Sequence, residues 1–385
     1  MTPRLAAAKA IVRGVHGLAA AVDRVRLART RALMFQAMVA KNPRLVAPAR
    51  PAYLADVQTY WTRHYGRRVD PRWHVALFNV TGVEDVRFVP HFVWWDEILG
   101  MFNDRALRPA YGDKNLYRRL LRHERAPATV VKRMRGRYYD GDDRPLARDA
   151  ARERLLAGGG ERIVKPSRTD NGEGVARLRV AAGVAWRGDA AVDLDDLERS
   201  HGDDFLVQAA IEQHPAMAAP HSASVNTVRL LTLRWDGAPR VLLAFARFGV
   251  DGRVTDNAGT GGIACGIDDD GRLHDAAVDK AGRVHRRHPT SGYDFGARQH
   301  VPGFDAARRL VVELHAQLPH FDLVSWDIAI DPLAAPVFVE ANFRGSSFLY
   351  QFASRRPIFG DLTPQVLAAL RRRHGRGAPP AATPA

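Results

Sequence analysis

The pattern of apolar and polar positions predicts a helical start followed by a longer region of mixed α+β structure. Residues 4–40 are rich in alanine, and their apolar residues recur at alternating steps of four and three, as on one face of a helix. The pattern over residues 51–104 predicts both a strand and a helix, with a strand-like run, VRFVPHFVWW, before a helical one, DEILGMF. From about residue 162 to 343, strands alternate with short helices. A helix is predicted in YGDKNLYRRLLRHE, with Asp113 near its start, and a last helix at about 363–373.

This pattern divides the chain into four parts. We predict a basic amphipathic helix and linker over 1–50, a mixed α/β segment over 51–104, a main domain over 105–375 and a disordered Pro/Ala tail over 376–385. The first helix is basic enough to contact an anionic membrane surface. Packing on the rest of the protein or on a partner helix is the favoured alternative.

Carboxylates occupy core positions in the sequence SWDIAIDPLAAPVFVEANF, residues 325–343. Two β-rich runs flank the four residues Pro-Leu-Ala-Ala, which predicts a hairpin in which Asp331 faces Pro336. In that register Asp327 faces Glu340 directly, and Asn342 points to the same side of the sheet. Opposed like charges destabilise a sheet unless a proton or a cation compensates, and an all-oxygen set suits Mg²⁺. The alternative is an exposed edge hairpin with solvated carboxylates.

Three other segments carry groups suited to an anion. A predicted strand ends at Lys165, before a loop with Gly172 and Gly174, whose backbone N–H groups could approach a phosphate. A second predicted strand, VARLRV, follows the loop. Arg229 and Arg247 lie inside two apolar strands, 225–235 and 240–248, joined by Asp236-Gly237. Each arginine could bind a phosphate or carboxylate, or form an internal Arg–Asp salt bridge. The polar, Gly-rich run TDNAGTGGI could wrap a bound group, so we predict substrate contacts at Asn257, Gly261 and Gly262.

Composition narrows the class of partner. The formal net charge of +15 invites a nucleic-acid partner, but only six of the 57 basic residues are lysines and the arginines are spread along the chain. A bias toward GC-rich codons explains this better than a nucleic-acid surface, so we expect no nucleic-acid partner. The single cysteine, Cys265, excludes an internal disulfide and suits a reducing cytoplasm. Neither a membrane-spanning run nor a signal peptide is expected.

Taken in order, these segments resemble the ATP-grasp superfamily, in particular the sugar-transfer-associated ATP-grasp proteins, which are similar in motif order to the alpha-L-glutamate ligases. The segments are YGDKN (111–115), IVKPSRTDNGEGV (163–175), VQAAIEQHP (207–215), SVNTVRLLT (224–232), RFGVDGRVTDNAGTGGI (247–263), HPTSGYDF (288–295) and VSWDIAIDPLAAPVFVEANF (324–343). The resemblance covers about residues 105–370. It implies an α+β, two-lobed fold whose antiparallel sheets clamp ATP.

The resemblance also assigns roles to individual residues. Lys114 and Lys165 would bind phosphate, the latter beneath a flexible loop that holds Asn171, Gly172 and Gly174. Adenine and ribose would contact the consecutive residues Gln208, Ala209, Ala210, Ile211 and Glu212. Asp327, Glu340 and Asn342 would carry Mg²⁺, and Arg229 and Arg247 would face the transferred phosphoryl group as catalytic residues.

The expected activity is therefore an ATP- and Mg²⁺-dependent ligase. It would convert a small-molecule carboxylate into an acyl phosphate, which an amine or hydroxyl acceptor attacks. The family's naming suggests an acceptor from cell-surface sugar or polysaccharide biosynthesis. The alternatives are a kinase acting on a sugar or small-molecule hydroxyl, and a nucleotide-binding scaffold without catalysis.

Overall fold

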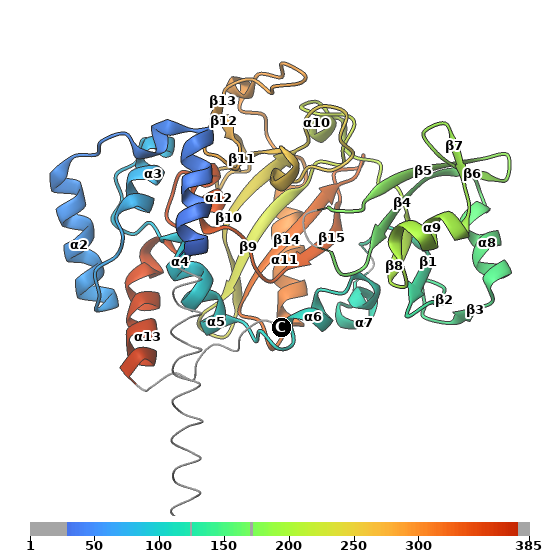
Figure 1. Cartoon of the computed structure of the whole chain (residues 1–385), viewed down its shortest axis with the longest axis horizontal. Helices are drawn as coiled ribbons and strands as arrows, with labels where there is room; N and C mark the ends of the chain where they lie inside the picture. Colours follow the sequence, from blue (N-terminus) through green and yellow to red (C-terminus); the bar gives the residue numbers. More distant parts are fainter. Residues whose placement is uncertain (1–28, 124, 170–171, 376–385) are drawn as a thin grey trace, which may run out of the picture.

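The computed structural model describes residues 29–123, 125–169 and 172–375, which form two antiparallel β-sheets with helices around them (Figure 1). Of the predicted first helix, residues 29–41 are helical, while residues 1–28 lie outside the described residues. The predicted tail over 376–385 and the predicted loop residue Asn171 also lie outside them.

One sheet has eight strands in the order β3-β2-β1-β8-β4-β5-β6-β7 and lies on the right of Figure 1. Its strands are β1 (Thr129–Met134), β2 (Arg137–Tyr139), β3 (Pro145–Leu146), β4 (Gly160–Pro166), β5 (Ala176–Ala181), β6 (Val184–Arg187), β7 (Ala190–Val192) and β8 (Phe205–Ala209). The helices α8 (Arg148–Leu156) and α9 (Leu194–His201) bury their apolar residues against it. The predicted strands on both sides of the loop after Lys165 are confirmed as the antiparallel pair β4–β5.

The other sheet has seven strands in the order β13-β12-β11-β10-β9-β14-β15 and fills the centre of the molecule (Figure 1). Its strands are β9 (Val228–Arg234), β10 (Pro239–Phe248), β11 (Ile263–Ile267), β12 (Leu273–Val278), β13 (Val284–His285), β14 (Leu323–Ile330) and β15 (Pro336–Asn342). The predicted hairpin joined by Asp236-Gly237 is confirmed as the pair β9–β10.

Helices cover both faces of the seven-stranded sheet, which explains why β9 is apolar on both sides. Leu230 packs with α11 (Phe304–Ala316) on one face, whereas Leu231 and Leu233 pack with α12 (Ser347–Ser354) on the other. A strand buried on both faces has little room for charge, so Arg229 within β9 needs a specific partner.

A helical layer packs beyond α12 and closes this side of the molecule (left in Figure 1). Its elements are η1 (Pro43–Val46), α2 (Pro51–Tyr65), α3 (Arg72–Thr81), α4 (His91–Val93), the π-helical turn η2 (Trp94–Ile98), α5 (Leu99–Phe102) and α13 (Thr363–Gly375). The prediction of a strand in VRFVPHFVWW is wrong, because Pro90 caps the helix α4 within this run. The run is apolar because its aromatic residues form the core of the helical layer.

The hairpin β14–β15 keeps the predicted pairing at its functional end but not at its turn. Ile330, not Asp331, faces Pro336, and the loop has five residues rather than four. A bulge between Asp327 and Ile328 then shifts the register by one residue, so Asp327 still faces Glu340.

The single helix predicted from YGDKNLYRRLLRHE is also wrong. The chain instead forms α6 (Arg108–Tyr111), η3 (Lys114–Leu116) and α7 (Tyr117–Leu120). The Asp113 carboxylate accepts a hydrogen bond from the Asn115 backbone N–H at 3.0 Å and starts a new turn at Lys114. The remaining short helices are α10 (Pro215–Ala218), η4 (Ala258–Thr260), η5 (Phe295–Ala297) and η6 (Gly360–Leu362). In the described part of the chain, every helix is too short or too polar to cross a bilayer.

Candidate active site

A cleft of about 500 Å³ lies between the two sheets. Strands β4 and β8 of the eight-stranded sheet supply one wall, and β9, β10, β14 and β15 of the other sheet supply the opposite wall. Among the residues that the structure describes, seven basic ones line it, against the three acids Asp256, Asp327 and Glu340. The basic residues are Arg108, Lys114, Lys165, Arg229, Arg247, Lys280 and Arg344. This excess of positive charge suits a polyanionic ligand.

The wall from the eight-stranded sheet combines apolar residues with one amide. Ile163, Ala209 and Ile211 line the cleft, and so does Gln208, whose amide nitrogen lies 3.4 Å from Thr129 Oγ1. Two predicted members of this set do not line it. The Ala210 backbone N–H donates to the Glu161 carbonyl at 3.1 Å, and Glu212 is exposed outside the cleft lining.

Lys114 connects the two walls. Its backbone N–H donates to the Ser167 carbonyl at 2.9 Å, and its Nζ donates to the Thr169 carbonyl at 2.8 Å. The same Nζ lies 3.0 Å from Glu340 Oε1 on β15. One buried ammonium group thus holds the loop after β4 close to the predicted metal-binding carboxylate.

Lys165 is buried at the end of β4 and lines the cleft. Burial lowers its pKa to about 8; the Lys114 charge acts in the same direction and Glu340 opposes it. Within the described residues, Lys165 makes no ion pair with an acid at 4 Å or less. A buried lysine in this state gains most from an anionic ligand.

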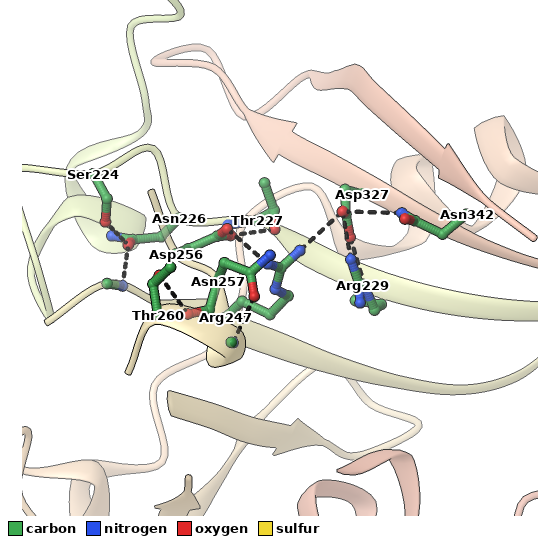
Figure 2. A network of polar contacts seen from close by, with 12 residues as sticks. Ser224, Asn226, Thr227, Arg229, Arg247, Asp256, Asn257, Thr260, Asp327 and Asn342 are labelled. Carbon is green, nitrogen blue, oxygen red and sulfur yellow. Dashed lines mark hydrogen bonds and ion pairs between the residues drawn. The ribbon is translucent and has the colours of Figure 1, made fainter. Parts of the chain in front are cut away.

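Asp327 is surrounded by donors on the opposite wall (Figure 2). Arg229 donates from Nε to Asp327 Oδ1 at 2.7 Å and from Nη2 to Oδ2 at 2.6 Å. Arg247 donates from Nη1 to the same Oδ2 at 2.8 Å, and its Nη2 lies 3.1 Å from Asp256 Oδ1. Of the two alternatives for these arginines, an internal Arg–Asp salt bridge is therefore present at both.

The charge balance of this cluster is reflected in its titration. Burial alone would raise the pKa of Asp327, but Arg229 and Arg247 together lower it to about 2. The same interaction with Asp327 raises the pKa of Arg229, against the effect of its burial. Asp327 and Arg229 therefore stay charged at any physiological pH.

The predicted glycines differ in whether they line the cleft or allow the backbone to pack closely. Gly172 lines the cleft, whereas Gly174 does not: a Cβ there would lie 2.7 Å from Pro166 Cγ, where the loop closes on β4. In the second Gly-rich loop, Asn257 lines the cleft but Gly261 and Gly262 do not. A Cβ on Gly262 would lie 2.6 Å from the Asp256 carbonyl oxygen, so this glycine allows the loop to pack tightly.

Comparison with known proteins identifies the family of this chain. A family model described as sugar-transfer associated ATP-grasp matches residues 96–365. The chain belongs to this family. No curated protein matches the chain.

This sugar-transfer associated ATP-grasp chain is also similar to solved structures, at low identity. L-amino acid ligase from Bacillus licheniformis is 12% identical over 67% of this chain and 48% of its own, with a TM-score of 0.34. D-Ala:D-Ser ligase from Enterococcus faecalis is 12% identical over 68% of this chain and 61% of its own, with a TM-score of 0.39. D-alanine–D-alanine ligase from Bacillus anthracis is 13% identical over 76% of this chain and 78% of its own, with a TM-score of 0.40. The chain spans about half the length of the first of these proteins.

The predicted Mg²⁺ ligands of this ATP-grasp chain differ in how free their oxygens are. Both Asp327 oxygens accept from the arginines, and Oδ2 also accepts from the Asn342 amide nitrogen at 3.2 Å. That contact leaves the Asn342 amide oxygen for another partner, and among the described acids and bases Glu340 contacts only the ammonium group of Lys114. Hard oxygen donors from Glu340 and Asn342 fit Mg²⁺, which takes one or two carboxylates and completes its shell with phosphates and water. In the part of the chain that the structure describes, no three His, Cys, Asp or Glu side chains form a closed metal site.

The cleft also contains residues that the sequence analysis did not single out. Trp95, Arg108, Lys280, Arg344 and Tyr350 all line it. Lysine is so scarce in this chain that Lys280 could have been suspected on that ground alone. Trp95 gave no such signal, because aromatic residues in its segment are mostly core.

Proposed function

We propose that this chain is an ATP- and Mg²⁺-dependent ligase that joins a carboxylate to an amine or hydroxyl. The observation that carries the proposal is the basic cleft between the two sheets, where Lys114 and Lys165 come from one side and Glu340 from the other. An ATP triphosphate would neutralise this excess positive charge, and the apolar residues around Gln208 would contact the adenine.

The reaction would proceed in two steps, through an acyl phosphate. A carboxylate oxygen of the substrate attacks the γ-phosphorus of ATP, the bond to the bridging oxygen breaks, and ADP leaves. The acceptor nitrogen or oxygen then attacks the carbonyl carbon of the acyl phosphate, inorganic phosphate leaves, and the acceptor loses a proton to solvent or base. The chain's own contribution is to position the reactants and stabilise charge.

Individual residues take separate parts in this scheme. Lys165 would lie against the phosphates and regain a full positive charge there, while Lys114 would exchange Glu340 for a phosphate oxygen. Glu340 and Asn342 would hold Mg²⁺, which neutralises phosphate charge when bound. Asp327 would serve chiefly as the anion that fixes the Arg229 and Arg247 guanidinium groups toward the transferred group.

Hydroxylamine provides a test that does not need the natural acceptor. Because it attacks any acyl phosphate, a library of carboxylates can be screened with ATP and Mg²⁺ for hydroxamate formation. We expect at least one acid to give hydroxamate and an equal amount of ADP and phosphate. Lys165→Met should abolish the signal, whereas Lys41→Met, at an exposed lysine outside the cleft, should retain it.

Isotope labelling separates the ligase from a kinase. With an ¹⁸O-labelled carboxylate, a ligase transfers one labelled oxygen to inorganic phosphate. A kinase instead yields a phosphorylated product and no free phosphate. ATP binding without turnover for any acid or hydroxyl would contradict both and favour a scaffold.

The biological setting follows from the family's description alone. Its link to sugar transfer supports an acceptor used in cell-surface sugar or polysaccharide synthesis, and the need for ATP favours a cytoplasmic location. Comparing sugar-linked amines and hydroxyls with free amino acids in the same product assay would test the acceptor class.

A further inference from the structure

Arginine side chains gather at one end of the helical layer, where α2, α5 and α13 finish (the lower end of α13 in Figure 1). They come from three separate parts of the chain, residues 63–68, residue 105 and residues 371–373, and each of them is exposed. We call this group the basic end. Its seven members are Arg63, Arg67, Arg68, Arg105, Arg371, Arg372 and Arg373.

Contacts between the helices show that the three parts of the basic end are neighbours. Arg371 Nη1 donates to the Arg63 carbonyl at 3.1 Å, and Arg373 Nη1 donates to the Gly100 carbonyl at 2.9 Å. A Cβ on Gly100 would lie 2.9 Å from Arg105 Nη2, so Arg105 packs against the same glycine. Burial lowers the pKa of Arg105, and the charge of Arg373 acts in the same direction. The end of α13 therefore connects the arginines after α2 with the arginine after α5.

The basic end is poor in counter-ions. Within the described part of the chain, none of its seven arginines makes an ion pair with an acid at 4 Å or less. Nearby acids have other partners: Asp70 accepts from Arg72 Nε at 2.7 Å, and Glu97 contacts His374 Nε2 at 2.6 Å. Asp104 accepts a backbone N–H of its own turn at 2.8 Å and is the one of these three acids without a basic partner. The positive charge of the basic end is thus largely uncompensated.

Helix capping accounts for only part of this charge. Basic side chains near the C-terminal end of a helix satisfy free carbonyls and offset the helix dipole. Arg371 and Arg373 each use one nitrogen in this way, although a guanidinium group has five N–H donors. Three helix ends carry together only about 1.5 units of negative charge. Most of the guanidinium charge of the basic end therefore faces solvent.

The chemistry of the basic end fits an anionic membrane surface better than a nucleic acid. Clusters of about four to eight basic residues are typical of surfaces that bind acidic lipid headgroups. Surfaces that bind nucleic acid combine basic residues with exposed aromatic rings, or present one helix or strand to a groove. Here the neighbouring aromatic residues Trp61 and Tyr65 are only 0% and 4% exposed, and the arginines lie at the ends of several helices.

We propose that the basic end binds the surface of an anionic lipid bilayer, with its guanidinium groups on the phosphates of the lipid headgroups. This interaction goes beyond the ligase function and does not depend on it. It also differs from a membrane contact of the first helix, whose described part packs into the helical layer through Phe35 and Met38. Arginine and phosphate form charge-assisted hydrogen bonds, which give the contact its strength.

Vesicle sedimentation with the full chain tests the basic end. We expect binding to vesicles of equal parts phosphatidylcholine and phosphatidylglycerol, none to phosphatidylcholine alone, and weaker binding as the salt concentration rises. Arg67→Gln/Arg68→Gln should weaken the binding about 30-fold, because each basic residue near an anionic surface contributes roughly fivefold.

A matched control removes the same charge at the other end of the molecule. Arg152→Gln/Arg187→Gln changes two exposed arginines on α8 and β6, at the right of Figure 1, which make no ion pair with a described acid. This variant should bind the anionic vesicles as the wild type does. Hydroxamate formation without vesicles should be unchanged in every variant, so failure of this proposal is distinguishable from failure of the ligase function.

Three results would overturn the proposal. The first is a wild-type chain that does not bind the anionic vesicles. The second is equal weakening by Arg67→Gln/Arg68→Gln and by the control, which would assign the binding to net charge alone. The third is binding of duplex DNA that Arg67→Gln/Arg68→Gln weakens, without binding to vesicles, which would assign the basic end to a nucleic acid. Arg371→Gln/Arg372→Gln provides a second test of the same surface if the first variant does not fold.

Discussion

The buried charges on the two walls of the cleft differ in whether they have counter-ions within the fold. On the seven-stranded sheet, Arg229, Arg247, Asp256 and Asp327 pair with one another and form a balanced cluster (Figure 2). On the eight-stranded sheet, Lys165 is buried beside another lysine, and its pKa falls to about 8. A cluster that is complete without a ligand contributes to the fold, whereas a charge that lacks a counter-ion contributes to binding.

Removing the central acid should have the largest effect on stability. Asp327→Asn leaves two buried guanidinium groups without their main counter-charge, and breaking a buried pair in this way costs about 3–5 kcal/mol. We expect a decrease of that size in the free energy of unfolding, measured by denaturant titration.

A matched control is available near the same strand. Asp322 pairs with Arg234 at 3.1 Å, but its side chain is 42% exposed, so Asp322→Asn should cost less than about 1 kcal/mol. If the two variants lost equal stability, the contrast between a structural cluster and a solvated pair would not hold.

Lys165→Met should show the reverse behaviour. The loss of a charge-assisted contact to phosphate should weaken binding of the ATP analogue by about 2 kcal/mol, roughly 30-fold. Stability without nucleotide should stay the same or rise, because the buried charge no longer has to be desolvated. Equilibrium binding together with thermal unfolding measures both quantities. If Lys165→Met lost stability but bound the analogue normally, Lys165 would contribute to the fold and not to nucleotide binding.

The smallest effect is expected where the helical layer contacts the cleft. Trp94→Phe removes the hydrogen bond to the Gly345 carbonyl, and Trp61→Phe removes an equivalent bond of 2.8 Å to the Val86 carbonyl, away from the cleft. Each should cost about 1 kcal/mol of stability. Only Trp94→Phe should also raise the KM of the second substrate, since it loosens the segment that holds Arg344. Equal KM values in the two variants would indicate that the layer supports the fold alone.

Much of this arrangement follows from local sequence pattern. Alternation and turn residues predict the β4–β5 and β9–β10 hairpins, and they place Asp327 opposite Glu340. The bulge that preserves this pairing leaves no clear mark in the sequence, because an extra residue in an apolar strand looks like any other. Here the predicted register was wrong by one residue at the turn and right at the site.

The sequence could not show the contacts that depend on which strands are neighbours in the sheet. Arg229 meets Asp327 because β9 and β14 lie side by side, although 98 residues separate them along the chain. The helical layer was misread for a related reason: an apolar aromatic run predicts burial but not whether the backbone is extended or helical.

The most direct test of nucleotide binding between the two sheets is the number of protons taken up with the nucleotide. At pH 8.5, a pKa of about 8 leaves most Lys165 side chains neutral, and a bound triphosphate should restore their charge. Calorimetric titration of the Mg²⁺-bound ATP analogue, repeated in buffers of different ionisation enthalpy, should give an uptake of more than about half a proton per nucleotide in the wild type. In Lys165→Met the uptake should be close to zero. Nucleotide binding with the same proton uptake in both proteins would contradict a triphosphate bound against Lys165.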